Sequence, residues 1–114
     1  MIRHIPMALA VVVLIAIGAT AMENNGAENI TLDGGSRGRI MFPHHRHQEA
    51  LKDCQVCHKL FPKEKDGIKR LKSEGKLNRK QVMNTLCVKC HKANAREGKR
   101  SGPRTCTQCH VRDS

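Results

Sequence analysis

Near the middle of the chain the sequence reads Cys54-Gln55-Val56-Cys57-His58. The same Cys-x-x-Cys-His pattern returns as Cys87-Val88-Lys89-Cys90-His91 and as Cys106-Thr107-Gln108-Cys109-His110. These first, middle and last motifs contain all six cysteines, so none is left for another purpose. Their spacing is uneven, which does not fit a simple repeat array. The sequence therefore predicts three similar sites at unequal intervals.

The rest of the chain offers little from which to build a core. It has 114 residues, no Trp, no Tyr, and only Phe42 and Phe61 as phenylalanines. A chain this short and this poor in aromatic residues can bury little apolar side-chain area. Small domains of this kind usually depend on disulfides, metals or cofactors. We therefore expect something other than side chains to fill the interior.

The Cys-x-x-Cys-His pattern is typical of c-type haem attachment. Two cysteines three positions apart lie along one face of a helical turn, where each can form a thioether to the porphyrin. The histidine that follows is then held under the iron as its proximal ligand. The motifs therefore predict three covalent c-type haems with His58, His91 and His110 as proximal ligands.

Two other uses of cysteine pairs are the alternatives. Three pairs do not divide evenly into four-ligand zinc sites, and zinc does not require a histidine after each pair. A scaffold of three disulfides is the second alternative, because six cysteines in a small secreted protein usually indicate one. The histidine after every pair favours haem over both.

Each haem iron has a second axial position, and three unassigned histidines cluster in Pro43-His44-His45-Arg46-His47. His44 and His47 share one face of a helix at i, i+3 spacing. Adjacent helical residues point about 100° apart, so His45 is directed elsewhere. We predict that His44 and His47 ligate two neighbouring haems, and that the last haem takes a ligand from another segment.

The N-terminus has the features of a Sec-type secretion signal. Residues 1–7 form a short basic lead, residues 8–19 are an apolar run, and Ala19-Thr20-Ala21 offers small residues for cleavage. The sequence predicts a signal peptide over residues 1–21, a mature domain over residues 22–114, and a periplasmic location. The apolar run is short for a membrane span, although an uncleaved anchor is the alternative.

The mature part favours a small α+β fold, mostly irregular and helical. Residues 28–32 and 39–42 predict a short N-terminal β-hairpin, and residues 44–51 a short helix. A second helix is predicted over residues 78–86, and the polar stretch 93–102 is predicted as loop. We expect a haem-cored protein with a hairpin and a few short helices wrapped around three c-type haems.

The sequence resembles the class III multihaem cytochromes c, and most closely the three-haem cytochrome c7 type. The residues that carry this resemblance are Phe42-Pro43-His44-x-x-His47-Gln48, Asp53-Cys54-x-x-Cys57-His58 and Gly102-Pro103-x-Thr105-Cys106-x-x-Cys109-His110. It covers about residues 28–114. It implies that His44 ligates the haem of the first motif and His47 the haem of the middle motif.

In that family the last haem takes a histidine four residues before the first cysteine of the middle motif. This sequence has Met83 there. Methionine is a known haem ligand that raises the reduction potential, so the resemblance implies Met83 as the remaining axial ligand. Two alternatives stay open: Met83 is a packed apolar residue while His45 or another group binds the iron, or the iron has an open site.

Charge bears on partners. The formal charge of +11 falls to +10 when Arg3 leaves with the signal peptide. Haem propionates lower it to about +7 when oxidised and about +4 when reduced. The surplus suits docking to redox proteins with acidic surfaces. Export argues against a nucleic-acid partner, and membrane contact is expected only through the signal peptide or a membrane redox complex.

These features predict a periplasmic electron-transfer protein that is not an enzyme. Six-coordinate irons resist substrate binding and favour electron transfer. The alternative is a small haem enzyme, or a subunit of a redox complex, with one open or weakly ligated haem that reduces a small substrate.

Overall fold

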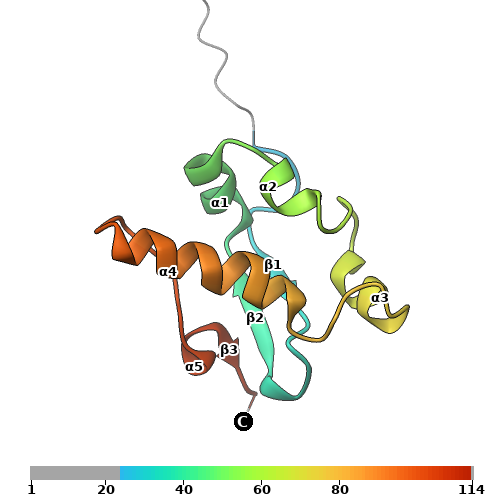
Figure 1. The fold of residues 1–114 in the computed structure, drawn as a ribbon. Helices are drawn as coiled ribbons and strands as arrows, with labels where there is room; N and C mark the ends of the chain where they lie inside the picture. Colours follow the sequence, from blue (N-terminus) through green and yellow to red (C-terminus); the bar gives the residue numbers. More distant parts are fainter. Residues whose placement is uncertain (1–23, 114) are drawn as a thin grey trace, which may run out of the picture.

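The computed structural model describes residues 24–113 (Figure 1). The predicted signal peptide and its cleavage site lie outside this range. Within it, no helix has both the length and the apolar character that a membrane span requires. The predicted α+β fold, with N-terminal antiparallel strands followed by several short helices, is confirmed.

The N-terminal hairpin consists of β1 (Ile30–Leu32) and β2 (Arg39–Phe42), paired antiparallel with Ile30 opposite Phe42. A short 3-10 helix, η1 (Gly35–Arg37), forms part of the connection. A two-residue strand, β3 (His110–Val111), pairs with the other edge of β2 and completes a sheet in the order β1-β2-β3. The sequence did not predict β3, which carries the histidine of the last motif.

Helix α1 (His44–Leu51) follows Pro43 and has the predicted bounds. It ends at Lys52, which adopts a left-handed conformation with φ of 53° and donates its N–H to the Gln48 carbonyl at 2.8 Å. The first motif comes directly afterwards in the short helix α2 (Gln55–His58). Only a few residues therefore separate the helix of the histidine cluster from the helix of the first motif.

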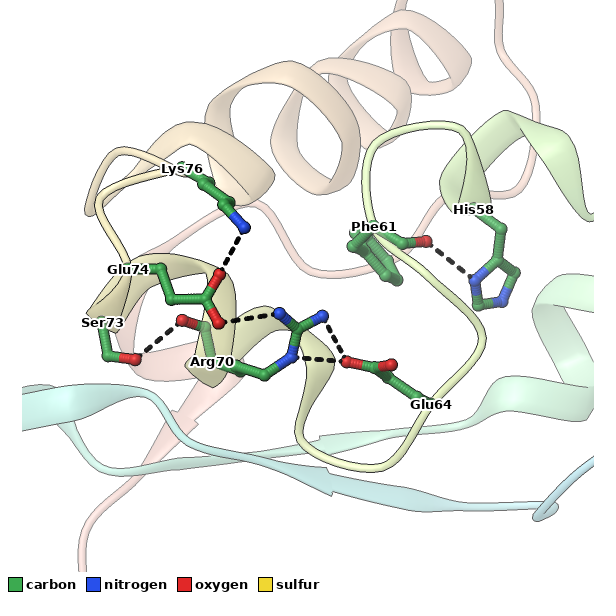
Figure 2. A network of polar contacts seen from close by, with 7 residues as sticks. All are labelled: His58, Phe61, Glu64, Arg70, Ser73, Glu74 and Lys76. Carbon is green, nitrogen blue, oxygen red and sulfur yellow. Dashed lines mark hydrogen bonds and ion pairs between the residues drawn. The ribbon is translucent and has the colours of Figure 1, made fainter.

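The connector between the first and middle motifs, residues 59–86, contains α3 (Gly67–Ser73), which is held by ionic contacts. Arg70 binds Glu64 on one side and Glu74 on the other, and Lys76 pairs with Glu74 at 2.7 Å (Figure 2). The chain then turns back, and Leu77 donates its N–H to the Leu71 carbonyl at 3.2 Å. These contacts, all within residues 64–77, stabilise the fold of the connector locally.

The longest helical segment begins at Gln81, whose side chain accepts a hydrogen bond from the Asn78 N–H at 2.9 Å, as in a capping box. It passes through the π-helical segment η2 (Met83–Cys87) into α4 (Val88–Arg96). The predicted end of this helix at residue 86 is wrong, and so is the predicted loop over residues 93–96. A helix already nucleated extends easily, and Ala93 and Ala95 have the highest helix propensity.

Side chains do not fill the interior of the described part of the chain. Among residues 24–113, Leu77 is the only buried hydrophobic residue, with 5% of its surface exposed. No side chain in this range is fully buried. Figure 1 shows the short helices arranged around the hairpin. An ordered chain with so little apolar packing requires a further component in its interior, as the sequence predicts.

Candidate functional site

The three motifs present their cysteines from helical turns. The first lies in α2, the middle one spans the junction of η2 and α4, and the last lies in α5 (Cys106–Cys109). In the first motif, His58 donates its N–H to the Cys54 carbonyl at 2.9 Å, which closes one helical turn. Within residues 24–113, no disulfide joins any of the six cysteines, so the disulfide alternative is not formed in this structure.

Cysteines from different motifs lie close enough to influence one another. Burial raises the pKa of the Cys57 thiol, and the nearby Cys90 raises it further. The pKa of Cys87 is also raised, first by the atoms packed around its thiol, although its surface stays accessible, and then by Cys57 and Cys109. The three motifs therefore converge on one region of the molecule.

This convergence does not create a zinc site. Within residues 24–113, no group of three or more His, Cys, Asp or Glu side chains is arranged to hold a metal ion. The cysteines therefore fit a group that joins them covalently, as haem does, better than they fit a bare metal ion.

The motif histidines share one hydrogen-bonding pattern. Nδ1 of His58 donates to the Phe61 carbonyl at 3.2 Å (Figure 2), because a carbonyl oxygen can only accept. Nδ1 of His91 donates to the Pro103 carbonyl at 2.5 Å, and Nδ1 of His110 donates to the Gly38 carbonyl at 3.1 Å. Metal-bound histidines almost always use their second nitrogen in this way, which orients the ring and leaves Nε2 for the metal.

The three histidines of the cluster differ in which ring nitrogen faces a backbone carbonyl. Nδ1 of His44 faces the Ala27 carbonyl at 3.0 Å, and Nδ1 of His47 faces the Pro43 carbonyl at 2.9 Å. His45 instead uses Nε2, which faces the Gly26 carbonyl at 2.9 Å. The tautomers of His44 and His47 therefore suit metal binding through Nε2, whereas His45 has already committed that atom.

Two pairs of rings have the separation expected of imidazoles on opposite sides of one iron. The centroids of His44 and His58 lie 6.3 Å apart, and those of His47 and His91 lie 6.1 Å apart. An imidazole nitrogen lies about 2 Å from a bound metal and about 1.2 Å from its own centroid, so two opposed rings have centroids about 6.4 Å apart. The structure thus brings each predicted distal histidine to a predicted proximal one, at a spacing that fits a haem iron.

The last site is formed differently. His110 lies on β3 and borders a cavity of about 380 Å³ together with Cys106, Arg37 and Arg112. Met83 is half-buried and begins η2, on the helical segment that leads to Cys87. Its position corresponds to that of the family's histidine ligand for the last haem, and its role as a ligand stays a prediction.

Sequence reasoning missed the groups that orient the rings. The Phe61 ring packs edge-on against His58, with centroids 5.3 Å apart. Gly102 lies so close to His91 that a Cβ atom there would be 2.5 Å from Cε1 of the ring. The Gly102-Pro103 dipeptide was a visible signal, but the backbone carbonyls that accept from Nδ1 have no signature in a single sequence.

Comparison with known proteins places these features in one family. A family model described as cytochrome c7 and related cytochrome c matches residues 40–111. The chain is 29% identical over 73 residues to a cytochrome c7 from Geobacter metallireducens, and the match covers 64% of each protein. It is 32% identical over 83 residues to a high-molecular-weight cytochrome c from Nitratidesulfovibrio vulgaris, covering 63% of this chain and 14% of that protein. The chain therefore spans less than two thirds of the length of these two relatives.

Solved structures show the same fold. PpcC, a cytochrome c7 from Geobacter sulfurreducens, superposes with a TM-score of 0.53 at 28% identity, covering 76% of this chain and all of that one. The triheme cytochrome PpcA from the same organism superposes with a TM-score of 0.51 at 29% identity, covering 75% of this chain and all of that one.

Proposed function

The chain belongs to the cytochrome c7 family of triheme cytochromes, and we propose that it is a periplasmic electron carrier with three separate axial ligand pairs. Members of the family are electron carriers, and the cysteine pairs 54/57, 87/90 and 106/109 are consistent with three covalently attached haems c. When bound, each haem supplies an iron that alternates between the ferric and ferrous states.

We assign His58 and His44 to the first haem, and His91 and His47 to the middle haem. The observation that carries this assignment is the spacing of the two ring pairs, 6.3 and 6.1 Å between centroids. The engagement of Nδ1 in all four rings supports it, because it frees Nε2 for the iron. His110 and Met83 are assigned to the last haem by their place in the family pattern.

These residues favour electron transfer over substrate chemistry. A histidine on each side of an iron occupies both axial positions, so a small substrate has no free position to bind. His44 and His47 lie one turn apart on α1, which places the first and middle ligand pairs side by side. An electron could therefore pass directly from the first haem to the middle haem.

The location and the partners follow from the sequence. The apolar leader and its small-residue cleavage site support export to the periplasm. The excess of Lys and Arg over Asp and Glu supports partners with acidic docking surfaces. Association driven by such charges weakens as the ionic strength rises, so transfer rates to an acidic partner should fall with added salt.

Carbon monoxide separates a carrier from a haem enzyme, because it binds a ferrous iron with a free axial position. The oxidised protein should take up three electrons per chain, and the reduced protein should not change its visible spectrum under carbon monoxide. A carbon monoxide complex at one haem would instead favour the alternative function, a small reductase with an open site. Loss of that complex in a Met83→His variant would locate the open site at the last haem.

A further inference from the structure

The turn of the N-terminal hairpin, residues 33–38, reaches the histidine of the last motif. The Gly38 carbonyl accepts the hydrogen bond from Nδ1 of His110 at 3.1 Å. Gly34 lies against the same ring, where a Cβ atom would be 2.5 Å from Nδ1 and 2.9 Å from Cε1. These groups are more than 70 residues away in the sequence, and the pairing of β3 with β2 brings them together.

Both glycines are required by this contact. Gly38 has φ of 100°, a conformation that residues with a side chain rarely adopt, and a Cβ there would collide with the Val111 carbonyl. Gly34 has φ of −95°, which any residue tolerates. Its lack of a side chain is therefore needed for space alone, since a Cβ would collide with the Gly38 oxygen and the His110 ring.

Further contacts fix the hairpin turn in place. Lys69 of α3 pairs with Asp33 at 3.3 Å, and Arg79 approaches Ser36 with 3.5 Å between Nη2 and Oγ. Next to the turn, Arg39 pairs with Asp113 beyond β3. The turn is thus linked to α3 and to the segment that leads to Met83, while the strand next to it pairs with β3. These links keep the turn against the His110 ring.

We propose that the hairpin turn positions the His110 imidazole for the iron of the last haem, with Gly34 and Gly38 as positioning residues. This inference rests on the proposed role of His110 as an axial ligand. A carbonyl that accepts from Nδ1 fixes the tautomer and increases the donor strength of Nε2. A stronger donor stabilises ferric iron, so the Gly38 carbonyl lowers the reduction potential of the last haem, and loss of the contact raises it.

The test compares Gly34→Ala with Gly35→Ala in the holoprotein. Gly35 is the matched control because it belongs to the same turn, has φ of 63°, and nothing lies within 4 Å of the Cβ it lacks. Its substitution therefore strains the turn without approaching His110. In a redox titration followed by NMR, Gly34→Ala should shift the last haem to a more positive potential and leave the other two in place. Gly35→Ala should leave all three near their parent values.

A second measurement needs no variant. In the fully reduced parent, which is diamagnetic if all irons are low-spin, the Nδ1–H proton of His110 should exchange slowly with solvent. Rapid exchange of this proton would overturn the proposal. So would equal shifts in the two glycine variants, or no shift in Gly34→Ala. If Gly34→Ala does not mature into holoprotein, the exchange rate in the parent decides.

The same experiments separate this inference from the proposed function. If the parent lacks a third haem, or if the His110 ring resonances show no ligation to iron, the assignment of His110 as an axial ligand is wrong. The failure then concerns the proposed function and not the positioning role of the hairpin turn alone. If ligation is present but the hydrogen bond is absent, only the role of the hairpin turn fails.

Discussion

Replacing each histidine of the α1 cluster in turn separates ligands from a bystander. The ring pairs support the proposed assignment of His44 to the first haem and His47 to the middle haem, whereas Nε2 of His45 faces the Gly26 carbonyl. For two imidazoles whose Nε2 atoms face one another along the line of centroids, subtracting about 1.2 Å for each ring from the 6.3 Å separation gives about 4 Å between the nitrogens, twice the metal–nitrogen distance of about 2 Å. Alanine ends at Cβ and cannot span that gap. His44→Ala and His47→Ala should therefore each convert about one third of the haem from low spin to high spin.

Electron paramagnetic resonance of the oxidised protein can tell the two sites apart. The planes of His44 and His58 meet at 86°, whereas those of His47 and His91 meet at 34°. Nearly perpendicular imidazoles leave the iron d orbitals close in energy and give a strongly anisotropic signal at high g. More nearly parallel imidazoles split these orbitals and give a rhombic signal. His44→Ala should remove the first type of signal, and His47→Ala the second.

His45→Ala is the matched control, because it removes an imidazole from the same helix. It should retain the complete low-spin spectrum. A high-spin species in His45→Ala would refute the assignment, and so would loss of the same signal in both His44→Ala and His47→Ala. Either result would mean that the ring separations do not report axial pairing.

Three other predictions follow from the sequence and the structure. Mass spectrometry should find a chain that begins at Met22 and carries three haems with no free thiol; zinc or disulfides in their place would contradict the attachment motifs. A variant with all six cysteines changed to alanine should show little ordered structure by circular dichroism, because Leu77 alone among residues 24–113 is a buried apolar side chain; cooperative melting would contradict this. Lys76 and then Arg70 hold the pKa of Glu74 below its usual value, so Glu74 stabilises the fold above its unfolded pKa and this contribution is lost as the pH falls through its folded pKa. Glu74→Gln should therefore lower the thermal midpoint at neutral pH, and the difference from the parent should diminish as the pH falls below the unfolded pKa of about 4.3 and through the lower folded pKa.

The sequence predicted the elements whose signals are local. Alternation in residues 28–32 and the turn signal after them indicated the hairpin, and Pro43 marked the start of α1. Strand β3 could not be predicted, because two residues have no pattern of their own and their pairing partner, β2, lies about 70 residues earlier. The end of α4 was misplaced because polar residues after His91 read as loop, while the helix continued through Ala93 and Ala95.

The residues of the site also differ in whether a local sequence pattern can reveal them. Cysteines and histidines at fixed spacing identify the chemistry from sequence, because attachment and ligation need those residue types within one turn. The partners of Nδ1 could not be predicted. All five are backbone carbonyls, those of Ala27, Gly38, Pro43, Phe61 and Pro103, and any residue can supply a carbonyl. Only the glycines that let the backbone come close leave a trace in the sequence.

This division explains how the fold can persist at low sequence identity. PpcC shares 28% of its residues with this chain, yet the two superpose over all of PpcC. Conventional cores limit divergence, because each buried side chain must complement its neighbours. Here the described residues contain one buried hydrophobic side chain, and backbone carbonyls hold the predicted iron ligands. Selection for such a fold acts on attachment cysteines, axial ligands and a few glycines. Exposed positions can then change charge with little cost in stability, which lets one scaffold serve different redox partners.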